Sequence, residues 1–478
     1  MSKRKNGKQE SWAEIEFEGI DLGDPRLNER LVKLTDSLSA SPESSINHAC
    51  PNWAETKGAY RFFKNEGVDK KEILTSHAQK TAKRAERHPI VLAIQDTCFF
   101  NYTSHRKTTG LGPIFTKKER SGRTLSSVGI IMHTSFAVTT EGLPLGILDQ
   151  TLFTREPNVE GKEKKHRRDI AIEDKESMRW LNALDKTQKV VGDHVVEVVT
   201  VCDREGDFYE LFERANKIGS SVLIRACTDR IINKKSLYSE KTRDKLWSFM
   251  QSLPSQGTLE VQIPARGGKS ARSALLKMRF SPFRMNPPIN NIRHKTEKLM
   301  DMNLTAVYVT EENPPKGEEA LEWMLLTNLL VTCFNDAIEK VRWYCLRWRI
   351  EVFHKILKSG LRVEQCRLQM ADRLTRYLTV MSIIAWKIYW MTLIGRAHPE
   401  WPCTCFLDDQ EWKVLYVRFQ QTKSYPKTPP SVREAVHWIA RLGGFLDRKG
   451  DGEPGVITLW RGWKRLSELA EGWTLALT

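Results

Sequence analysis

The chain is 478 residues long, which favours roughly two to four domains over one compact core. Hydrophobic residues make up 40% of the sequence and charged residues 28%, so collagen-like and low-complexity classes are excluded and a soluble globular protein is expected. Lys and Arg outnumber Asp and Glu by 75 to 59, and the net charge of +16 favours polyanionic partners, of which nucleic acid is the simplest.

Neither the first residues nor the apolar stretches predict export or membrane insertion. The segment "MSKRKNGKQESWAEIEF" lacks the apolar core of a signal peptide, so we expect a cytoplasmic protein. The most membrane-like stretch, residues 377–395, carries Lys387 in its middle and has no second span beside it, which predicts a buried helix and no membrane partner. The Cys and His residues do not cluster, so a structural zinc site is not predicted.

The first 88 residues follow a helical pattern with clear start signals. Asp24 precedes Pro25 at the first position of one helix, and Asn52 and Asp69 precede two more, each with a Glu three residues later. The same segments are strongly basic. They predict a small helical DNA-binding module, and a helical spacer is the alternative.

A strand pattern follows these helices. The apolar run "PIVLAIQDT" predicts a buried strand that ends at Asp96, and the next segment predicts a hairpin that turns near Gly142. A helix around residues 170–187 then leads to a second buried strand, which ends at Asp203. A further helix and strand follow, so the expected fold class is α/β (mixed).

Residues 229–330 interrupt this alternation. Short strand-like segments, separated by turns rich in Gly and Pro, predict a β-rich insertion there. The chain then returns to a helix that starts at Asn335 or Asp336 and stops at Ser359 and Gly360. Helices predominate after it.

The helix before Gly360 carries a polar stripe. On a wheel of about 100° per residue, five polar residues fall within roughly 80°: Tyr344, Arg347, Glu351, Lys355 and Lys358. A surface ladder of i,i+4 ion pairs explains the stripe, at a gain of about 0.2–0.5 kcal/mol per pair. The alternative depends on Asp96 and Asp203, because three carboxylates can hold two divalent cations about 3.5–4 Å apart, and oxygen ligands suit magnesium or manganese.

The motif around Glu351 resembles a known family signature. Tyr344, Arg347, Glu351 and Lys358 meet the pattern Y-x2-R-x3-E-x6-K of the DDE transposases of the insertion-sequence-four family, in particular the branch that includes the transposon-five transposase. Supporting matches run in order through nearly the whole chain: "GDPR" (23–26), "GAYRF" (58–62), "VCDRE" (201–205), "NPPKGE" (313–318), "RWRIEVFHK" (347–355) and "IARLGGF" (439–445).

The resemblance implies an N-terminal, a catalytic and a C-terminal domain. A helical DNA-binding domain would span residues 1–70, and a ribonuclease-H-like catalytic domain would span residues 71–391, with the β-rich insertion at 229–330. A helical dimerisation domain would occupy residues 392–478. The bacterial cytosol, in association with the nucleoid, is the expected location.

The resemblance also implies site residues and a cofactor. Asp96, Asp203 and Glu351 would be the catalytic, metal-binding triad, with two Mg²⁺ ions for which Mn²⁺ could substitute. DNA would be contacted by Tyr344, Arg347, Lys358, Lys355, Trp323, Trp348, Arg225, Arg367, Arg26, Arg30 and Arg61. Trp323 would stack on a base flipped out of the duplex, with Trp348 in the same region, and core packing is the alternative for both. For the outlying basic residues the alternative is a solvated surface.

The implied function is cut-and-paste DNA transposition. A homodimer in a synaptic complex with double-stranded DNA would cleave the inverted-repeat ends of a transposon, form and resolve hairpins, and transfer the strands to target DNA. Two alternatives stay open: a non-catalytic DNA-binding inhibitor of transposition, and a metal-dependent DNA nuclease without strand transfer. The presence of Asp96, Asp203 and Glu351 together argues against the inhibitor.

Overall fold

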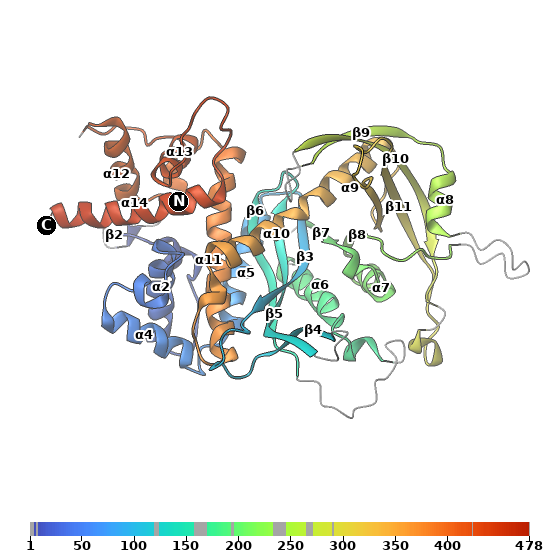
Figure 1. Ribbon diagram of the computed structural model, residues 1–478, viewed down its shortest axis with the longest axis horizontal. Helices are drawn as coiled ribbons and strands as arrows, with labels where there is room; N and C mark the ends of the chain where they lie inside the picture. The colour runs from blue at the N-terminus through green and yellow to red at the C-terminus, as the bar shows by residue number, and fades with distance from the viewer. Residues whose placement is uncertain are drawn as a thin grey trace, which may run out of the picture. The chain divides into compact units, whose positions relative to one another are not determined.

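The protein consists of two compact units in a computed structural model. The structure describes residues 4–5, 8–118, 124–156, 170–192, 196–232, 245–263, 271–288, 291–422 and 424–477. Unit 1 comprises residues 1–87, 97–158 and 349–478, and unit 2 comprises residues 88–96 and 159–348. Both units contain helices and strands, which confirms the mixed α/β class (Figure 1).

Helices dominate the N-terminal part of unit 1. They are α1 (Trp12–Glu16), α2 (Pro25–Ala40), α3 (Ile46–Ala49), α4 (Trp53–Lys64) and α5 (Lys70–Ala85), preceded by the short strands β1 (Arg4–Lys5) and β2 (Lys8–Gln9). The predicted caps are confirmed: the side chains of Asp24, Asn52 and Asp69 each accept a backbone N–H of the first helical turn, at 2.9, 2.9 and 2.8 Å. Each cap satisfies a donor that the helix itself leaves unbonded, and so fixes where the helix starts.

Unit 1 also contains a β-hairpin. β5 (Thr124–Thr139) pairs antiparallel with β6 (Pro144–Phe153) through a turn in which Gly142 has a φ of 89°, so the predicted hairpin is confirmed. β5 also pairs with β4 (Gly112–Lys118) and with β3 (Ile90–Asn101). The prediction that the first buried strand ends at Asp96 is wrong. The strand continues to Asn101 because its later residues stay paired along β5.

The C-terminal part of unit 1 is helical. Its elements are α10 (Trp348–Lys355, of which Trp348 belongs to unit 2), a π-helical turn (Ile356–Gly360), a 3-10 turn (Val363–Gln365), α11 (Ala371–Ala397), a second 3-10 turn (Cys403–Cys405), α12 (Asp409–Gln420), α13 (Val432–Leu442) and α14 (Val456–Leu477). Among the described residues, α11 alone is long and apolar enough to cross a membrane, yet nearly all of its side chains are buried inside unit 1. The prediction of a buried helix at 377–395 is therefore confirmed.

A mixed sheet forms the centre of unit 2. From β3 it runs through β7 (Glu197–Cys202), β8 (Ser221–Arg225), β12 (Glu322–Thr327), β11 (Met302–Glu311), β10 (Arg272–Met285) and β9 (Gly257–Ile263). β3, β7 and β8 run parallel, and the remaining neighbours are antiparallel. The strands predicted within residues 229–330 are present. They extend this sheet, because β12 pairs directly with β8 and places Leu325 opposite Arg225.

The helices of unit 2 differ from the sequence prediction in two places. They are α6 (Met178–Val191), α7 (Tyr209–Ile218), α8 (Leu246–Ser252) and α9 (Phe334–Leu346), with 3-10 turns at Ile172–Asp174, Arg204–Gly206 and Ile292–Lys295. The helix predicted at 170–187 starts only at Met178, after a 3-10 turn. The helix predicted to end at Gly360 does stop there, but it is interrupted: the N–H of Arg347 bonds to the carbonyl of Tyr344 at 3.0 Å, only three residues back, and so ends α9.

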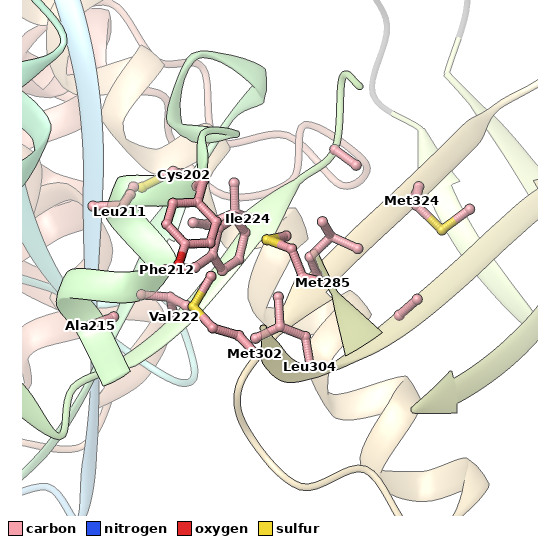
Figure 2. Packing of buried hydrophobic residues seen from close by; sticks show 14 of the residues in the cluster. Cys202, Leu211, Phe212, Ala215, Val222, Ile224, Met285, Met302, Leu304 and Met324 are labelled. Carbon is pink, nitrogen blue, oxygen red and sulfur yellow. The ribbon is translucent and has the colours of Figure 1, made fainter. Parts of the chain in front are cut away.

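An apolar cluster fixes the sheet of unit 2 from one side (Figure 2). It includes Cys202, Leu211, Phe212, Val222, Ile224, Met285, Met302 and Leu304, all of them buried. Burial of such side chains contributes roughly 1.5–3 kcal/mol each. Cys202 is the last residue of β7, so the chain leaves the packed core directly before Asp203.

Candidate active site

Two of the predicted carboxylates are placed side by side by strand pairing. β3 and β7 are parallel, and Gln95 lies opposite Cys202 at the end of their ladder. Asp96 follows Gln95, and Asp203 follows Cys202. Because β3 and β7 are parallel, both carboxylates belong to the same edge of the sheet. Burial raises the pKa of the Cys202 thiol well above its usual value, and the negative charges of Asp203 and Asp96 raise it further. The charges of both aspartates thus act on the same buried sulfur.

The backbone after β7 holds Asp203 in place. Its carboxylate accepts the N–H of Glu205 at 2.8 Å and thereby caps the 3-10 turn Arg204–Gly206. Asp207, which follows this turn, is buried and accepts the N–H groups of Cys227 and Thr228 at 2.6 and 3.0 Å. The guanidinium of Arg230 pairs with the same carboxylate. These bonds tie the segment after Asp203 to the segment after β8.

Asp207 and Arg230 were not predicted from the sequence. The second Asp of "VCDREGD" is the one feature of the sequence that could have indicated this pair. Its partner lies more than twenty residues away, in a loop that has no recognisable motif. A buried carboxylate is stable only when it is paired and hydrogen-bonded, and Asp207 meets both conditions. We assign the pair a positioning role for the segment that carries Asp203.

A guanidinium lies beside the first aspartate. Arg347 Nη1 is 3.7 Å from Asp96 Oδ2, and the two side chains are only 12% and 17% exposed. The guanidinium of Arg347 is thus nearly buried, and it forms an ion pair with a carboxylate of β3, which lies outside the predicted ladder. A cation in this position can neutralise a phosphate bound next to the carboxylates.

A phenol, a second guanidinium and an indole gather next to Arg347. Burial raises the pKa of the Tyr344 hydroxyl, whereas the charges of Arg347 and Arg225 oppose that rise and Arg225 also hydrogen-bonds to the hydroxyl. Arg225 Nη2 donates to the carbonyl oxygen of Glu322 at 3.0 Å. The half-buried ring of Trp323 meets the Tyr344 ring edge-on, with centroids 5.5 Å apart. The ends of β8 and β12 and the last turns of α9 thus bring these predicted DNA-contact residues together.

The remaining residues of the predicted core site belong to unit 1. Glu351 is half-buried in the first turn of α10, Lys355 and Arg367 are exposed, and the Lys358 ammonium lies 5.9 Å from the centroid of the Phe100 ring. Within the described ranges, no three His, Cys, Asp or Glu side chains are arranged to hold a metal ion. The third carboxylate of the predicted triad therefore stays a prediction.

The second predicted aromatic contact is exposed. Trp348 is the first residue of α10 and its side chain is 41% exposed, which agrees with the expected position at the edge of the polar stripe. The Arg347 guanidinium lies 5.9 Å from its ring centroid. Core packing is thus excluded for Trp348, whereas Trp323 combines partial burial with a contact to Tyr344.

The basic residues predicted in the N-terminal helices differ in their surroundings. The Arg26 side chain is 89% exposed and pairs with its own helix cap, Asp24, at 2.9 Å. Arg30 is less accessible, because it pairs with Glu55 and packs against Gly58. Arg61 is exposed on α4.

Helix α4 presents a mixed basic and aromatic face that was not predicted from the sequence. Arg61 shares this exposed face with Trp53, Lys57, Tyr60 and Lys64, and Trp53 is 67% exposed with the Lys57 ammonium 5.3 Å from its ring centroid. The opposite face, which includes Phe62 and Phe63, is buried. This face could have been predicted from the sequence by counting residues at helical spacing from the Asn52 cap. Exposed cations and aromatic rings on one helix can contact a nucleic-acid backbone.

Two protein-family models match the two ends of the chain. A model described as "Transposase DNA-binding" matches residues 9–68, which contain α1 to α4. A model described as "Transposase Tn5 dimerisation domain" matches residues 383–478, which contain most of α11 and all of α12 to α14. The exposed face of α4 thus lies in the first matched region.

Proposed function

Because the matched ends indicate that this chain is a Tn5-type transposase, we propose that it catalyses cut-and-paste DNA transposition. The proposed reaction is cleavage of the transposon ends, formation and resolution of hairpins, and transfer of the freed strands to target DNA. The observation that carries the proposal is the pairing of Gln95 with Cys202, because it sets Asp96 and Asp203 next to each other in a chain with transposase domains at both ends. A fold of the ribonuclease-H-like class is part of the same proposal.

The donor set fits hard divalent cations. Asp96 and Asp203 offer carboxylate oxygens, which Mg²⁺ prefers and Mn²⁺ also accepts. We propose Glu351 of α10 as the third ligand. When bound, such ions would activate a water or a 3′-hydroxyl and stabilise the leaving oxygen of the phosphodiester.

The residues around the aspartates suit a phosphate backbone. Arg347 beside Asp96, and Arg225 beside Tyr344, place two guanidiniums and a phenol where a scissile phosphate would bind. Lys358, Lys355, Arg367 and Trp348 are proposed as further DNA contacts from α10 and the segment after it. The exposed face of α4, together with Arg26, supports binding of the transposon end by the N-terminal region.

A homodimer in a synaptic complex is the proposed active assembly. The match over residues 383–478 supports self-association, and the match over residues 9–68 supports DNA as the partner. Each subunit would then bind a transposon end and supply one set of carboxylates.

The test is a cleavage assay with the purified full-length chain, Mg²⁺ and DNA that carries the inverted repeats flanking its own gene. We expect nicks, then hairpins, then products joined to a target plasmid, and none of these without a divalent metal. A metal-dependent nuclease would give breaks without joined products. A non-catalytic inhibitor would bind the ends and cleave nothing, and either outcome would overturn the proposal.

Substitution of Trp323 separates base stacking from core packing. In Trp323→Ala we expect hairpin formation to slow by roughly 5- to 150-fold, because stacking on an unpaired base is worth about 1–3 kcal/mol, while the first nick changes by about twofold or less. Time courses on denaturing gels measure both steps. Trp323→Phe keeps an aromatic face and should recover most of the hairpin rate. An equal loss of nicking and hairpin formation would instead assign Trp323 a packing role against Tyr344.

A further inference from the structure

A basic pocket lies among the C-terminal helices of unit 1, outside the candidate active site. Its volume is about 410 Å³, and its lining includes Arg418, Arg441, Arg465, Phe419, Phe445 and Leu446. These residues come from the C-terminal ends of α12 and α13, from the segment after α13, and from α14, which lie together in Figure 1. The lining holds three guanidiniums and no carboxylate.

An aromatic ring organises two of the guanidiniums. The Arg441 and Arg418 guanidinium carbons lie 4.8 and 5.9 Å from the centroid of the Phe419 ring. Phe419 itself stacks on Trp438 with centroids 5.9 Å apart and an interplanar angle of 10°, and Trp438 is buried. The Phe419 ring is therefore fixed by its packing against Trp438. Cation–π contacts with this ring keep the Arg418 and Arg441 guanidiniums near each other. Their mutual repulsion is relieved when an anion binds between them.

The guanidiniums have no acidic partner within the described part of the chain. Among the residues that the structure describes, none of the three forms an ion pair, and the side chains of Arg418 and Arg441 donate no hydrogen bond. Arg465 donates one, to the carbonyl of Leu442. Arg418 and Arg441 lie in the last turns of α12 and α13. A cation at such a position is stabilised by about 0.3–1 kcal/mol by the helix dipole, which explains in part why these two arginines are tolerated without an acidic partner. It does not account for Arg465, which comes from the middle of α14.

The backbone around the pocket is closely packed. A Cβ at Gly462 of α14 would lie 1.6 Å from the carbonyl oxygen of Ile439, and a Cβ at Gly443 would lie 1.8 Å from that of Thr458. Only glycine permits this approach of α13 to α14. Arg465 is thus held at the end of α13, close to Leu442.

We propose that this pocket binds a phosphate group of a DNA strand. Guanidinium forks match phosphate oxygens, and three of them around one cavity give a preorganised anion site. An acidic segment of a second copy is the competing occupant, but a chain of net charge +16 is a poor source of one. The site is separate from the region matched as DNA-binding, residues 9–68, and lies in the region matched for dimerisation. The proposal that the pocket binds an anion is independent of the proposed function. Only the choice of DNA as that anion rests on the proposed function.

The test measures duplex DNA binding by the full-length protein in metal-free buffer at several salt concentrations. For the double variant Arg418→Gln/Arg441→Gln we expect the dissociation constant to rise roughly tenfold at low salt. The slope of log K against log salt should fall by about 0.9 for each phosphate that is no longer neutralised. The matched control is Arg461→Gln, an exposed arginine of α14 outside the pocket lining, which should leave the slope unchanged. A slope equal to that of the control would overturn the proposal.

A second readout separates DNA from a partner subunit. DNA should protect Arg441 and Arg465 from modification by phenylglyoxal, as read by mass spectrometry, and should protect Arg461 less. Sedimentation of the double variant should show unchanged self-association. Weaker self-association with an unchanged salt slope would assign the pocket to a second copy and overturn the DNA proposal. Because the buffer contains no metal, a failure of cleavage chemistry does not affect this test.

Discussion

Asp203→Asn is expected to abolish metal-dependent cleavage, with a rate at least about 10³-fold below that of the unchanged chain. The amide keeps the size of the side chain and an oxygen that can accept the N–H of Glu205, so the cap of the 3-10 turn is retained. It removes the negative charge that a divalent ion requires. Single-turnover cleavage of transposon-end DNA in Mg²⁺ measures the loss, and DNA binding in metal-free buffer should stay within about twofold.

The matched control is Glu205→Gln, two residues along the same turn. Its carboxylate is 54% exposed and pairs with Arg179 at 3.1 Å, and Arg179 also pairs with Glu176 at 3.4 Å. We expect cleavage within about twofold, since an exposed carboxylate contributes little and Arg179 keeps a second acidic partner. If Asp203→Asn cleaves like this control, the assignment of Asp203 is wrong.

The same assay tests the third carboxylate. Asp96→Asn should lose as much activity as Asp203→Asn, because the two residues follow a pair in one ladder. Glu351→Gln should lose a similar amount if Glu351 completes the ligand set, whereas near-normal cleavage by this variant alone would remove it from the triad.

Local features of the structure were predictable because their causes are local. The caps at Asp24, Asn52 and Asp69 depend on one side chain and a backbone N–H a few residues away. The end of β7 before Asp203 follows from an apolar run that stops there. By contrast, β3 continues beyond Asp96 through pairing with a later strand, and hydrophobicity alone does not encode that pairing.

Contacts between distant segments were not predictable from the sequence. The motif spacing grouped Tyr344 with Arg347, but the contacts of Tyr344 with Trp323 and Arg225 depend on β12 pairing with β8. The helix breaks at Arg347 because its N–H bonds to the carbonyl of Tyr344, three residues back. A helical wheel assumes a continuous helix and does not predict this break. Spacing along one helix is therefore readable from the sequence, whereas the long-range contacts that position Tyr344 are not.

A buried ion-pair cluster joins the first helix of the DNA-binding match to the rest of unit 1. Glu16 of α1 is bound by Arg84 of α5 at 2.9 and 3.1 Å, and its Oε1 lies 2.6 Å from Nδ1 of His77. Nε2 of His77 accepts the N–H of Ile147 on β6 at 2.9 Å, so His77 is neutral and donates from Nδ1 to the carboxylate. Arg84 also lies over the Trp386 ring, at 4.1 Å.

Glu16→Gln is expected to lower the free energy of unfolding of unit 1 by about 3–5 kcal/mol, because it removes the charged partner of Arg84, whose side chain is only 26% exposed. Burial by itself raises the pKa of Glu16, but the charges and hydrogen bonds of Arg84 and His77 outweigh it and lower that pKa from 4.5 to about 2. The stabilisation by Glu16 is therefore complete above about pH 4.5 and is lost as the pH falls towards 2.

Urea unfolding between pH 7 and pH 2.5 measures this effect on the full-length chain. The difference between the unchanged protein and Glu16→Gln should be constant down to about pH 4.5 and should shrink below it, because protonation removes the same charge that the substitution removes. The control is Glu18→Gln, whose carboxylate is 65% exposed and pairs with Lys80 at 2.9 Å, so a change of only about 0–1 kcal/mol is expected. Equal effects of the two substitutions at pH 7 would mean that the Glu16 cluster does not hold α1 against α5 and β6.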